Sequence, residues 1–419
     1  MTLPRGMKDV RGAELDGIAY VRERFERLAA IYDYEPVWPS PLELLRTLET
    51  KSGPAIRDEI YEFKDKGGRE VGLRFDFTMG LTRLAAADLS APLPAKMSSF
   101  GGVFRYDEPQ KNRYRYFHQW DVEIYGRPHP AQDAELVEFT ARFFESLPLP
   151  VTIRLSHRSL MESHIRETFG DDASAVPDML RAVDKLQKRH PDDIVSEFSG
   201  YDPGKVRHIL EAARTRGSPS EAEPHLDPRM RDSPAWHDIT QIVDSLRGAG
   251  IRNVQVDLGV VRGLDYYTGM VFEVFGHNDD SSALAGGGRY DMLPGAFGRQ
   301  MGAAGVAGGV ERIVTALARP KTGGARVAVL YANDKVFGDA ARLAASLRRS
   351  GTRVRLDIAG RPLKKQMGTA SDCDVAVIVA PREMQRGEVI VRDMKSGTEQ
   401  TARYRDVADD PRVLGRLVP

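Results

Sequence analysis

Cysteine is almost absent from this sequence, because Cys373 is the single one among 419 residues. A lone cysteine excludes an internal disulfide and a zinc site built from several cysteines. It also fits a reducing compartment, so we expect a cytoplasmic protein. The side chain of Cys373 is expected to be a small buried apolar group rather than a reactive thiol.

Long apolar runs and an excess of one charge are missing as well. No apolar stretch approaches the roughly 20 residues that a membrane-spanning helix needs, and the first residues contain no apolar signal core. We therefore expect no membrane association. The 60 basic residues are balanced by 60 acidic ones. This balance argues against a chain-wide electrostatic grip on nucleic acid but allows a local basic surface.

The length and the pattern along the chain predict two domains, residues 1–320 and 326–419. Beyond residue 326 strands and helices alternate, which is typical of a small α/β domain with parallel strand pairing. Residues from about 160 to 235 are charged, helix-like and interrupted by glycine and proline, and they predict a helical insertion into the first domain.

Residues 98–126 form the centre of the functional argument, because they predict a strand, a basic loop and a second, antiparallel strand. The second strand alternates and places Gln119 and Glu123 on one face, beside Arg105 at the end of the first strand. Guanidinium groups bind phosphates, whereas amide and carboxylate groups bind an ammonium or a ring N–H. The pattern favours a nucleotide beside a small charged molecule, although a solvated strand face explains these residues equally simply.

Four other segments carry similar polar groups. Residues 71–78 alternate as a strand that places Asp76 and Thr78 on one face, where they could hold an ammonium. The turn 262–269 and the glycine-rich 286–291 surround strand 270–275 with arginines and tyrosines. Residues 302–317 predict a strand of small residues, then a helix with Arg312 in its first turn, where backbone N–H groups attract anions. Surface polarity and ordinary salt bridges explain each segment taken alone.

The N-terminal part predicts a long amphipathic helix over 14–33, followed by a short strand at 34–37. Prolines around that strand restrict it to the edge of a sheet. Such an arrangement serves either a subunit contact or plain core packing.

Together these segments resemble histidyl-tRNA synthetase, a class II aminoacyl-tRNA synthetase, over nearly the whole chain. The two segments similar to its histidine-specific signatures are the most specific, since the general class II motifs leave the amino acid open. The matching segments are Pro4–Gly6 and the helix over 14–33 with Ser40–Glu43 (opening and dimer-forming motif 1), Phe104–Glu123 (motif 2), Arg262–Gly269 and Gly286–Asp291 (histidine signatures), and Gly305–Arg312 (motif 3).

The resemblance implies an α+β fold: a class II antiparallel sheet flanked by helices, with a helical insertion and a C-terminal α/β domain of the anticodon-binding type. It implies a ligase that activates L-histidine with ATP and transfers it to the 3′ end of tRNA-His. It also implies a cytoplasmic homodimer and Mg²⁺ that arrives with ATP.

The resemblance further assigns residues to roles. Arginines would stabilise charge at the phosphates, other residues would bind ATP, and a third set would bind histidine. The catalytic set is Arg262, Arg105 and Arg312; the ATP set is Arg105, Asp107, Arg113 and Arg312; the histidine set is Asp76, Thr78, Gln119, Glu123, Tyr266, Tyr267, Arg289 and Tyr290.

Two positions depart from the family pattern. Asp107 stands where motif 2 usually carries glutamate, which makes its contact with ATP less secure, and Gly302 replaces a common proline in motif 3.

The main alternative is the synthetase-like, histidine-sensing regulatory subunit of ATP phosphoribosyltransferase, which has no ligase activity. That family typically lacks the C-terminal domain and part of the ATP-binding set, whereas residues 326–419 and all three arginines are present here. A pseudo-synthetase with a structural or signalling role would likewise lack the arginines. Histidine-dependent pyrophosphate exchange separates these possibilities.

Overall fold

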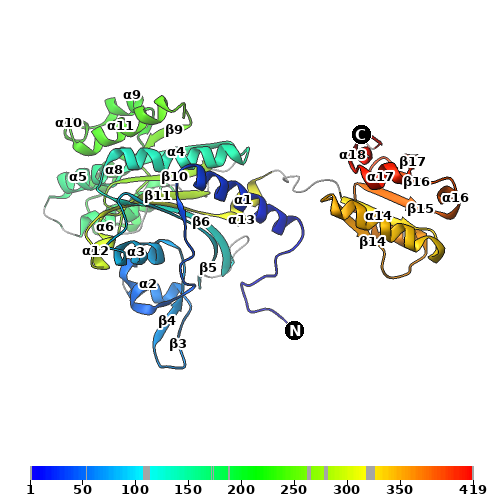
Figure 1. The fold of residues 1–419 in the computed structure, drawn as a ribbon. Helices are drawn as coiled ribbons and strands as arrows, with labels where there is room; N and C mark the ends of the chain where they lie inside the picture. Colours follow the sequence, from blue (N-terminus) through cyan, green and yellow to red (C-terminus); the bar gives the residue numbers. More distant parts are fainter. Residues whose placement is uncertain are drawn as a thin grey trace. The chain divides into compact units, whose positions relative to one another are not determined.

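The computed structural model describes residues 2–52, 54–106, 114–170, 172, 174–186, 189–261, 266–277, 282–317 and 326–417. The chain divides into two compact units, Met1–Pro320 and Lys321–Pro419 (Figure 1). None of the helices described is both long enough and apolar enough to cross a bilayer.

A nine-stranded sheet forms the centre of the first unit. All neighbouring strands are antiparallel except the pairs β1–β5 and β7–β9, which confirms the predicted antiparallel architecture. The predicted short strand does lie at the edge, as β1. In spatial order the strands are β1 (Glu35–Pro36), β5 (Ala95–Phe104), β6 (Tyr116–Gly126), β12 (Gly302–Gly309), β11 (Ala285–Arg289), β10 (Met270–Gly276), β7 (Val151–His157), β9 (Val254–Asp257) and β8 (Arg216–Gly217).

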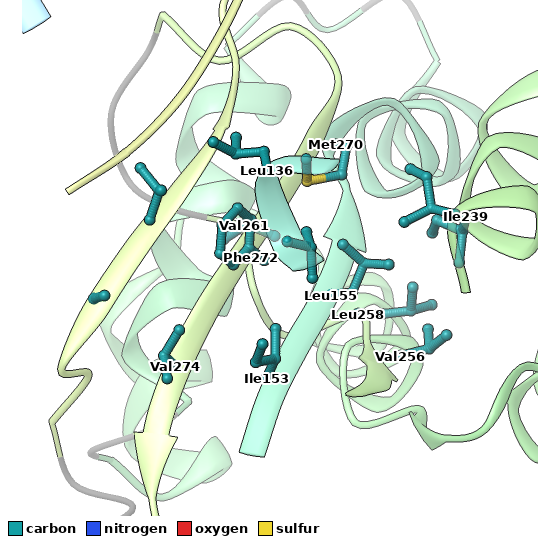
Figure 2. Packing of buried hydrophobic residues seen from close by; sticks show 14 of the residues in the cluster. Leu136, Ile153, Leu155, Ile239, Val256, Leu258, Val261, Met270, Phe272 and Val274 are labelled. Atoms are coloured by element: carbon teal, nitrogen blue, oxygen red, sulfur yellow. The ribbon is translucent and has the colours of Figure 1, made fainter. Parts of the chain in front are cut away.

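One face of this sheet is covered by helices that bury the larger apolar cluster. Figure 2 shows part of it, where Leu136 and Ile239 gather with side chains of β7, β9 and β10. Alternation along each strand sends every second side chain into this layer, as Phe272 and Val274 illustrate. The covering helices are α1 (Ala13–Ile31), α4 (Pro130–Ser146), α11 (Pro234–Gly248) and α13 (Val310–Ala316).

The opposite face carries a second cluster, which includes Phe77, Tyr125 and Val271. Shorter elements surround it and leave part of the sheet open. They are β2 (Leu42–Leu44), α2 (Leu45–Ser52), η1 (Pro54–Glu59), β3 (Glu62–Lys64), β4 (Glu70–Leu73), α3 (Thr78–Ala87) and α12 (Leu293–Ala296).

The strand expected over 71–78 is shorter than the alternation suggested. It ends at Leu73, the chain turns, and α3 begins at Thr78. The Asp76 carboxylate accepts the backbone N–H of Met79 at 3.3 Å, which satisfies a donor of the first helical turn. The prediction that Asp76 and Thr78 share a strand face was therefore wrong.

The helical insertion is present, and it is attached firmly to the first unit. Its Ile165, Met179 and Ile209 belong to the large apolar cluster, and β8 adds a strand to the sheet. Prolines stand in the first turn of several of its helices, where they need no hydrogen-bond partner. The elements are α5 (Arg158–Phe169), α6 (Ala175–Lys185), α7 (Pro191–Glu197), α8 (Pro203–Ala212), α9 (Pro219–Ala222), η2 (Glu223–His225) and α10 (Pro228–Arg231).

The second unit is the predicted small α/β domain, built on a five-stranded sheet in the order β14-β13-β15-β16-β17. Parallel pairing holds for β13 with β14 and β15, but β16 and β17 are antiparallel additions. Cys373 is buried, as expected. The elements are β13 (Arg326–Tyr331), η3 (Asp334–Val336), α14 (Phe337–Arg349), β14 (Arg353–Leu356), α15 (Leu363–Thr369), β15 (Val375–Val379), α16 (Pro381–Met384), β16 (Glu388–Asp393), β17 (Glu399–Arg403), α17 (Tyr404–Asp409) and α18 (Arg412–Leu417).

Candidate active site

A pocket of about 170 Å³ lies on the sheet face that carries the smaller apolar cluster. Segments far apart in the sequence meet there: η1, the turn before α3, the end of β5, strands β6, β11 and β12, and the segment before β10. Eight residues predicted for the site line this one pocket: Asp76, Thr78, Arg105, Gln119, Glu123, Tyr266, Tyr267 and Tyr290.

Strand β6 supplies two polar side chains of the pocket, Gln119 and Glu123. Both are buried, and both face away from the large apolar cluster, as the alternation predicted. Their Cα atoms are four residues apart, which corresponds to about 13 Å on an extended strand. The Gln119 side-chain oxygen has no hydrogen-bond partner among the described residues, so a donor in the pocket could satisfy it.

The Glu123 carboxylate is held in place by its neighbours. The Tyr290 hydroxyl donates a hydrogen bond to it. Burial, with the nearby Glu123 charge, raises the pKa of Tyr290 well above its ordinary value, which keeps the phenol protonated as a donor. On the paired strand, a Cβ added at Gly305 would overlap the Glu123 carboxylate. The missing side chain at Gly305 therefore gives Glu123 its space.

Three tyrosine rings form one wall of the pocket. The ring centroids of Tyr266 and Tyr267 are 4.3 Å apart, and Tyr290 lies 5.7 Å from the first and 6.4 Å from the second. Phenol rings combine an apolar body with a polar tip. This wall suits a flat ring that carries its own hydrogen-bonding atoms.

Asp76 and Thr78 reach the pocket from the turn and from the first residue of α3, rather than from a strand. Both are buried. A carboxylate and a hydroxyl thus lie in the same pocket as Gln119, and these three acceptors together suit an ammonium group.

The predicted arginines do not all enter the described pocket. Arg105 lines it, and its Nε donates to the Phe75 carbonyl at 3.2 Å. Arg312 is not among the residues that line this pocket, and its Nη1 donates to the Ala283 carbonyl at 2.9 Å. Its helix follows β12, whose Gly309 pairs with Gln119. Arg262, Asp107 and Arg113 lie outside the described residues.

Arg289 is a correction to the sequence prediction, which placed it in the pocket lining. Side chains alternate along β11, so Gly286 and Tyr290 face the pocket and Arg289 points to the other side of the sheet. There its guanidinium pairs with Asp133 at 2.7 Å and with Asp291 at 3.0 Å.

Several lining residues were not anticipated. Ile56 and Glu59 come from a 3₁₀ segment, and Phe75 comes from the turn after β4. Nothing in the spacing of these residues pointed to the site. The run of small residues that contains Gly305 was predicted as a strand, but its contact with Glu123 depends on the register of β6 and β12.

Comparisons with known proteins agree over nearly the whole chain. Residues 6–313 match the family model described as histidyl-tRNA synthetase, and residues 326–410 match the one described as anticodon binding domain. A histidine–tRNA ligase from Pyrococcus furiosus is 31% identical, covering 97% of this chain and 97% of the relative. One from Aeropyrum pernix is 33% identical, covering 92% and 91%.

Solved structures share the fold. A histidyl-tRNA synthetase from a Nostoc species superposes with a TM-score of 0.83 at 22% identity, covering 99% of each chain. A Bacillus halodurans protein described as an ATP phosphoribosyltransferase regulatory subunit/histidyl-tRNA synthetase gives a TM-score of 0.75 at 20% identity, covering 91% of this chain and 98% of the other.

Proposed function

The chain belongs to the histidyl-tRNA synthetase family and is a histidine–tRNA ligase, and we propose that the pocket beside β6 is where it activates histidine with ATP. The supporting observation is that polar groups suited to an ammonium and to a ring N–H line one pocket with Arg105. The regulatory-subunit alternative is not favoured, because the near-full-length curated relatives are ligases and the second unit matches an anticodon-binding model.

Histidine is proposed to lie along β6. Asp76, Thr78 and Gln119 would accept hydrogen bonds from its α-ammonium, and Glu123 and Tyr267 would bind the two imidazole nitrogens. Tyr266 would pack against the amino acid, while Tyr290 fixes the Glu123 carboxylate. An apolar competitor would offer no ring N–H to the buried Glu123 carboxylate, and such mismatches can reduce kcat/KM on the order of 10⁴-fold. A separate editing site is then unnecessary.

Activation would proceed by attack of a histidine carboxylate oxygen on the α-phosphorus of ATP. The new P–O bond forms as the bond to the bridging oxygen breaks, and pyrophosphate leaves with that electron pair. Arg105, Arg262 and Arg312 are proposed to stabilise negative charge on the phosphate oxygens. Asp107 and Arg113 would contact ATP from the motif 2 loop.

Transfer would follow when the 3′-terminal ribose hydroxyl of tRNA-His attacks the carbonyl carbon of the adenylate and releases AMP and a proton. The second unit would bind the anticodon end of the tRNA. Mg²⁺ is expected to enter on the ATP phosphates. The described residues contain no group of three or more potential ligands placed to hold a metal ion.

A cytoplasmic homodimer is also proposed. Trp38 is 77% exposed, and Leu42 and Leu44 nearby are 39% and 37% exposed. Leu42 lies in the segment Ser40–Glu43, which resembles part of the dimer-forming motif 1, and Trp38 and Leu44 flank that segment. Burial of such a surface between two copies would be favourable. Analytical ultracentrifugation tests this, since a monomer at micromolar concentration would contradict it.

The test of the proposed activation step is Arg262→Ala. Loss of one cation at the reacting phosphate is expected to reduce histidine-dependent pyrophosphate exchange by about 100-fold or more. Histidine binding, measured by calorimetry, should change little. Arg252→Ala is the matched control, because Arg252 is exposed and its Nη1 donates to the Arg247 backbone carbonyl at 2.8 Å. Unchanged exchange in the Arg262 variant would remove that residue from the mechanism.

A further inference from the structure

A buried ion pair joins the sheet to helix α4 on the face opposite the pocket. Arg289 of β11 contacts Asp133 of α4 through two hydrogen bonds, Nη2 to Oδ1 at 2.7 Å and Nε to Oδ2 at 3.2 Å. The two side chains are only 8% and 6% exposed. This two-pronged geometry fixes the direction of the guanidinium plane. The pair therefore holds one strand at a defined position relative to one helix.

The same arginine supports the segment that carries two of the pocket tyrosines. The Thr268 backbone N–H donates to the Arg289 carbonyl at 2.8 Å. A Cβ added at Gly269 would lie 3.1–3.3 Å from the Arg289 side chain, so the segment rests directly on it. Tyr266 and Tyr267 immediately precede this contact.

The third tyrosine is held between the two charged residues of the same network. Tyr290 follows Arg289 and precedes Asp291, whose carboxylate accepts from Arg289 at 3.0 Å and from the Ala303 N–H at 2.9 Å. The Tyr290 N–H donates to the Ala303 carbonyl at 2.7 Å. Displacement of Arg289 would thus reach all three rings of the pocket wall.

We propose that the Arg289–Asp133 pair is a positioning pair for histidine recognition, which holds the three tyrosines and, through Tyr290, the Glu123 carboxylate without touching the substrate. This rests on the proposed histidine pocket. A buried ion pair is weak support for stability, because desolvation offsets most of the attraction. Its two-pronged geometry is instead suited to fixing orientation, which is what a pocket that reads two ring nitrogens requires.

The first test is steady-state pyrophosphate exchange with Asp133→Asn, which keeps the shape and removes the charge. The KM for histidine should rise about 10- to 100-fold while the KM for ATP stays within about 2-fold, because small displacements of positioning groups cost on this scale. Selectivity over 2-thienylalanine, which lacks the ring nitrogens, should fall in parallel. Glu145→Gln is the matched control, as an exposed carboxylate on the same helix that pairs with Arg142. Equal changes in both KM values, or none, would overturn the proposal.

A second measurement is independent of catalysis. Hydrogen–deuterium exchange of peptides covering 266–277 should be faster in Asp133→Asn and in Arg289→Gln, and no faster in their double variant than in the faster single variant. The wild type could show no histidine-dependent pyrophosphate exchange while deuterium uptake in these peptides rises in the variants as described. That result would support the structural role of the pair and contradict the proposed function. If the peptides exchange as in wild type, the pair does not hold the segment and the proposal fails.

Discussion

At the scale of single residues, the pocket depends on positions without a side chain as much as on the polar side chains that line it. Gly305 shows this, because the Glu123 carboxylate occupies the position that any side chain at 305 would take. Tyr290 then holds that carboxylate through its hydroxyl. The Glu123 carboxylate, which would bind the imidazole, is thus held by the Tyr290 hydroxyl, and the lack of a side chain at Gly305 leaves room for it.

Gly305→Ala is predicted to displace Glu123 and raise the KM for histidine by at least about 10-fold, since 1 Å of misplacement can cost about 100-fold in rate. Overpacking should also lower the free energy of unfolding by about 1–3 kcal/mol. Exchange kinetics and chemical denaturation measure the two effects. Gly248→Ala is the control, because an added Cβ there meets nothing within 4 Å. A normal KM in the Gly305 variant would contradict the assignment of Glu123.

His157 is predicted to make stability depend on pH. Burial, with the Arg289 charge, lowers the pKa of His157 to about 4 from an ordinary 6.5. The folded protein therefore binds fewer protons than the unfolded chain between these values. Neutral His157 therefore contributes about 3 kcal/mol to the free energy of unfolding. This contribution is complete above pH 6.5 and is lost as the pH falls towards 4.

Comparison with His157→Asn isolates this effect. Asparagine can still accept the Ser159 N–H that His157 accepts at 3.3 Å. Burial raises the pKa of Asp133 to about 6, so this carboxyl group titrates in the same pH range and changes stability in the opposite direction. The quantity to measure is therefore the difference in unfolding free energy between the wild type and His157→Asn at each pH. Parallel curves of unfolding free energy between pH 4 and 6.5 would be incompatible with a buried neutral His157.

At the scale of elements, the sequence predicted strands well where alternation was regular and long. Gln119 and Glu123 were placed correctly on one strand face because β6 alternates regularly, and its partner β5 precedes it by a single loop. The prediction of a strand over 71–78 was wrong because the alternation continued past Leu73 by chance, while the hydrogen bond from the Met79 backbone N–H to the Asp76 carboxylate favoured a helix start.

Arg289 was misplaced for a related reason. A resemblance transfers a residue to a site but does not say which face of its strand it occupies, and one residue of register separates the pocket from the opposite layer. The contacts between Glu123 and Gly305 need the pairing of β6 with β12, which no local pattern in the sequence encodes.

Helix α13 gives the prediction at this scale. The Glu311 carboxylate accepts the His118 backbone N–H at 2.9 and 3.0 Å and contacts its ring Nδ1 at 2.9 Å, which ties the start of α13 to β6. Glu311→Ala should loosen the helix that carries Arg312, so the KM for ATP should rise about 3- to 10-fold, as for the loss of hydrogen bonds worth about 1 kcal/mol. The KM for histidine should stay near its wild-type value, and a selective rise in that constant would refute this connection.

At the scale of the whole molecule, two compact units divide the proposed work. The first contains every described residue of the pocket, and the second matches an anticodon-binding model. The helical insertion shares the large core of the first unit and adds β8 to its sheet, so it is expected to be needed for folding.

Removal of residues 321–419 is predicted to leave histidine-dependent pyrophosphate exchange within about 5-fold of the full chain, while charging of tRNA-His falls by at least about 100-fold. The physical reason is that activation needs only the pocket, whereas charging needs contacts along the tRNA, and each tenfold loss corresponds to about 1.4 kcal/mol of binding. Equal loss of both activities would show that the second unit also shapes the pocket. Circular dichroism of the truncated chain confirms that it is folded.

The central claim is that one pocket recognises histidine through its imidazole and activates it with ATP. Pyrophosphate exchange with the full chain, measured for histidine and for each of the other standard amino acids, tests it most directly. We predict exchange with histidine and at most about 10⁻⁴ of that kcat/KM with any other amino acid. Comparable exchange with a second amino acid, or histidine binding with no exchange at all, would contradict the account.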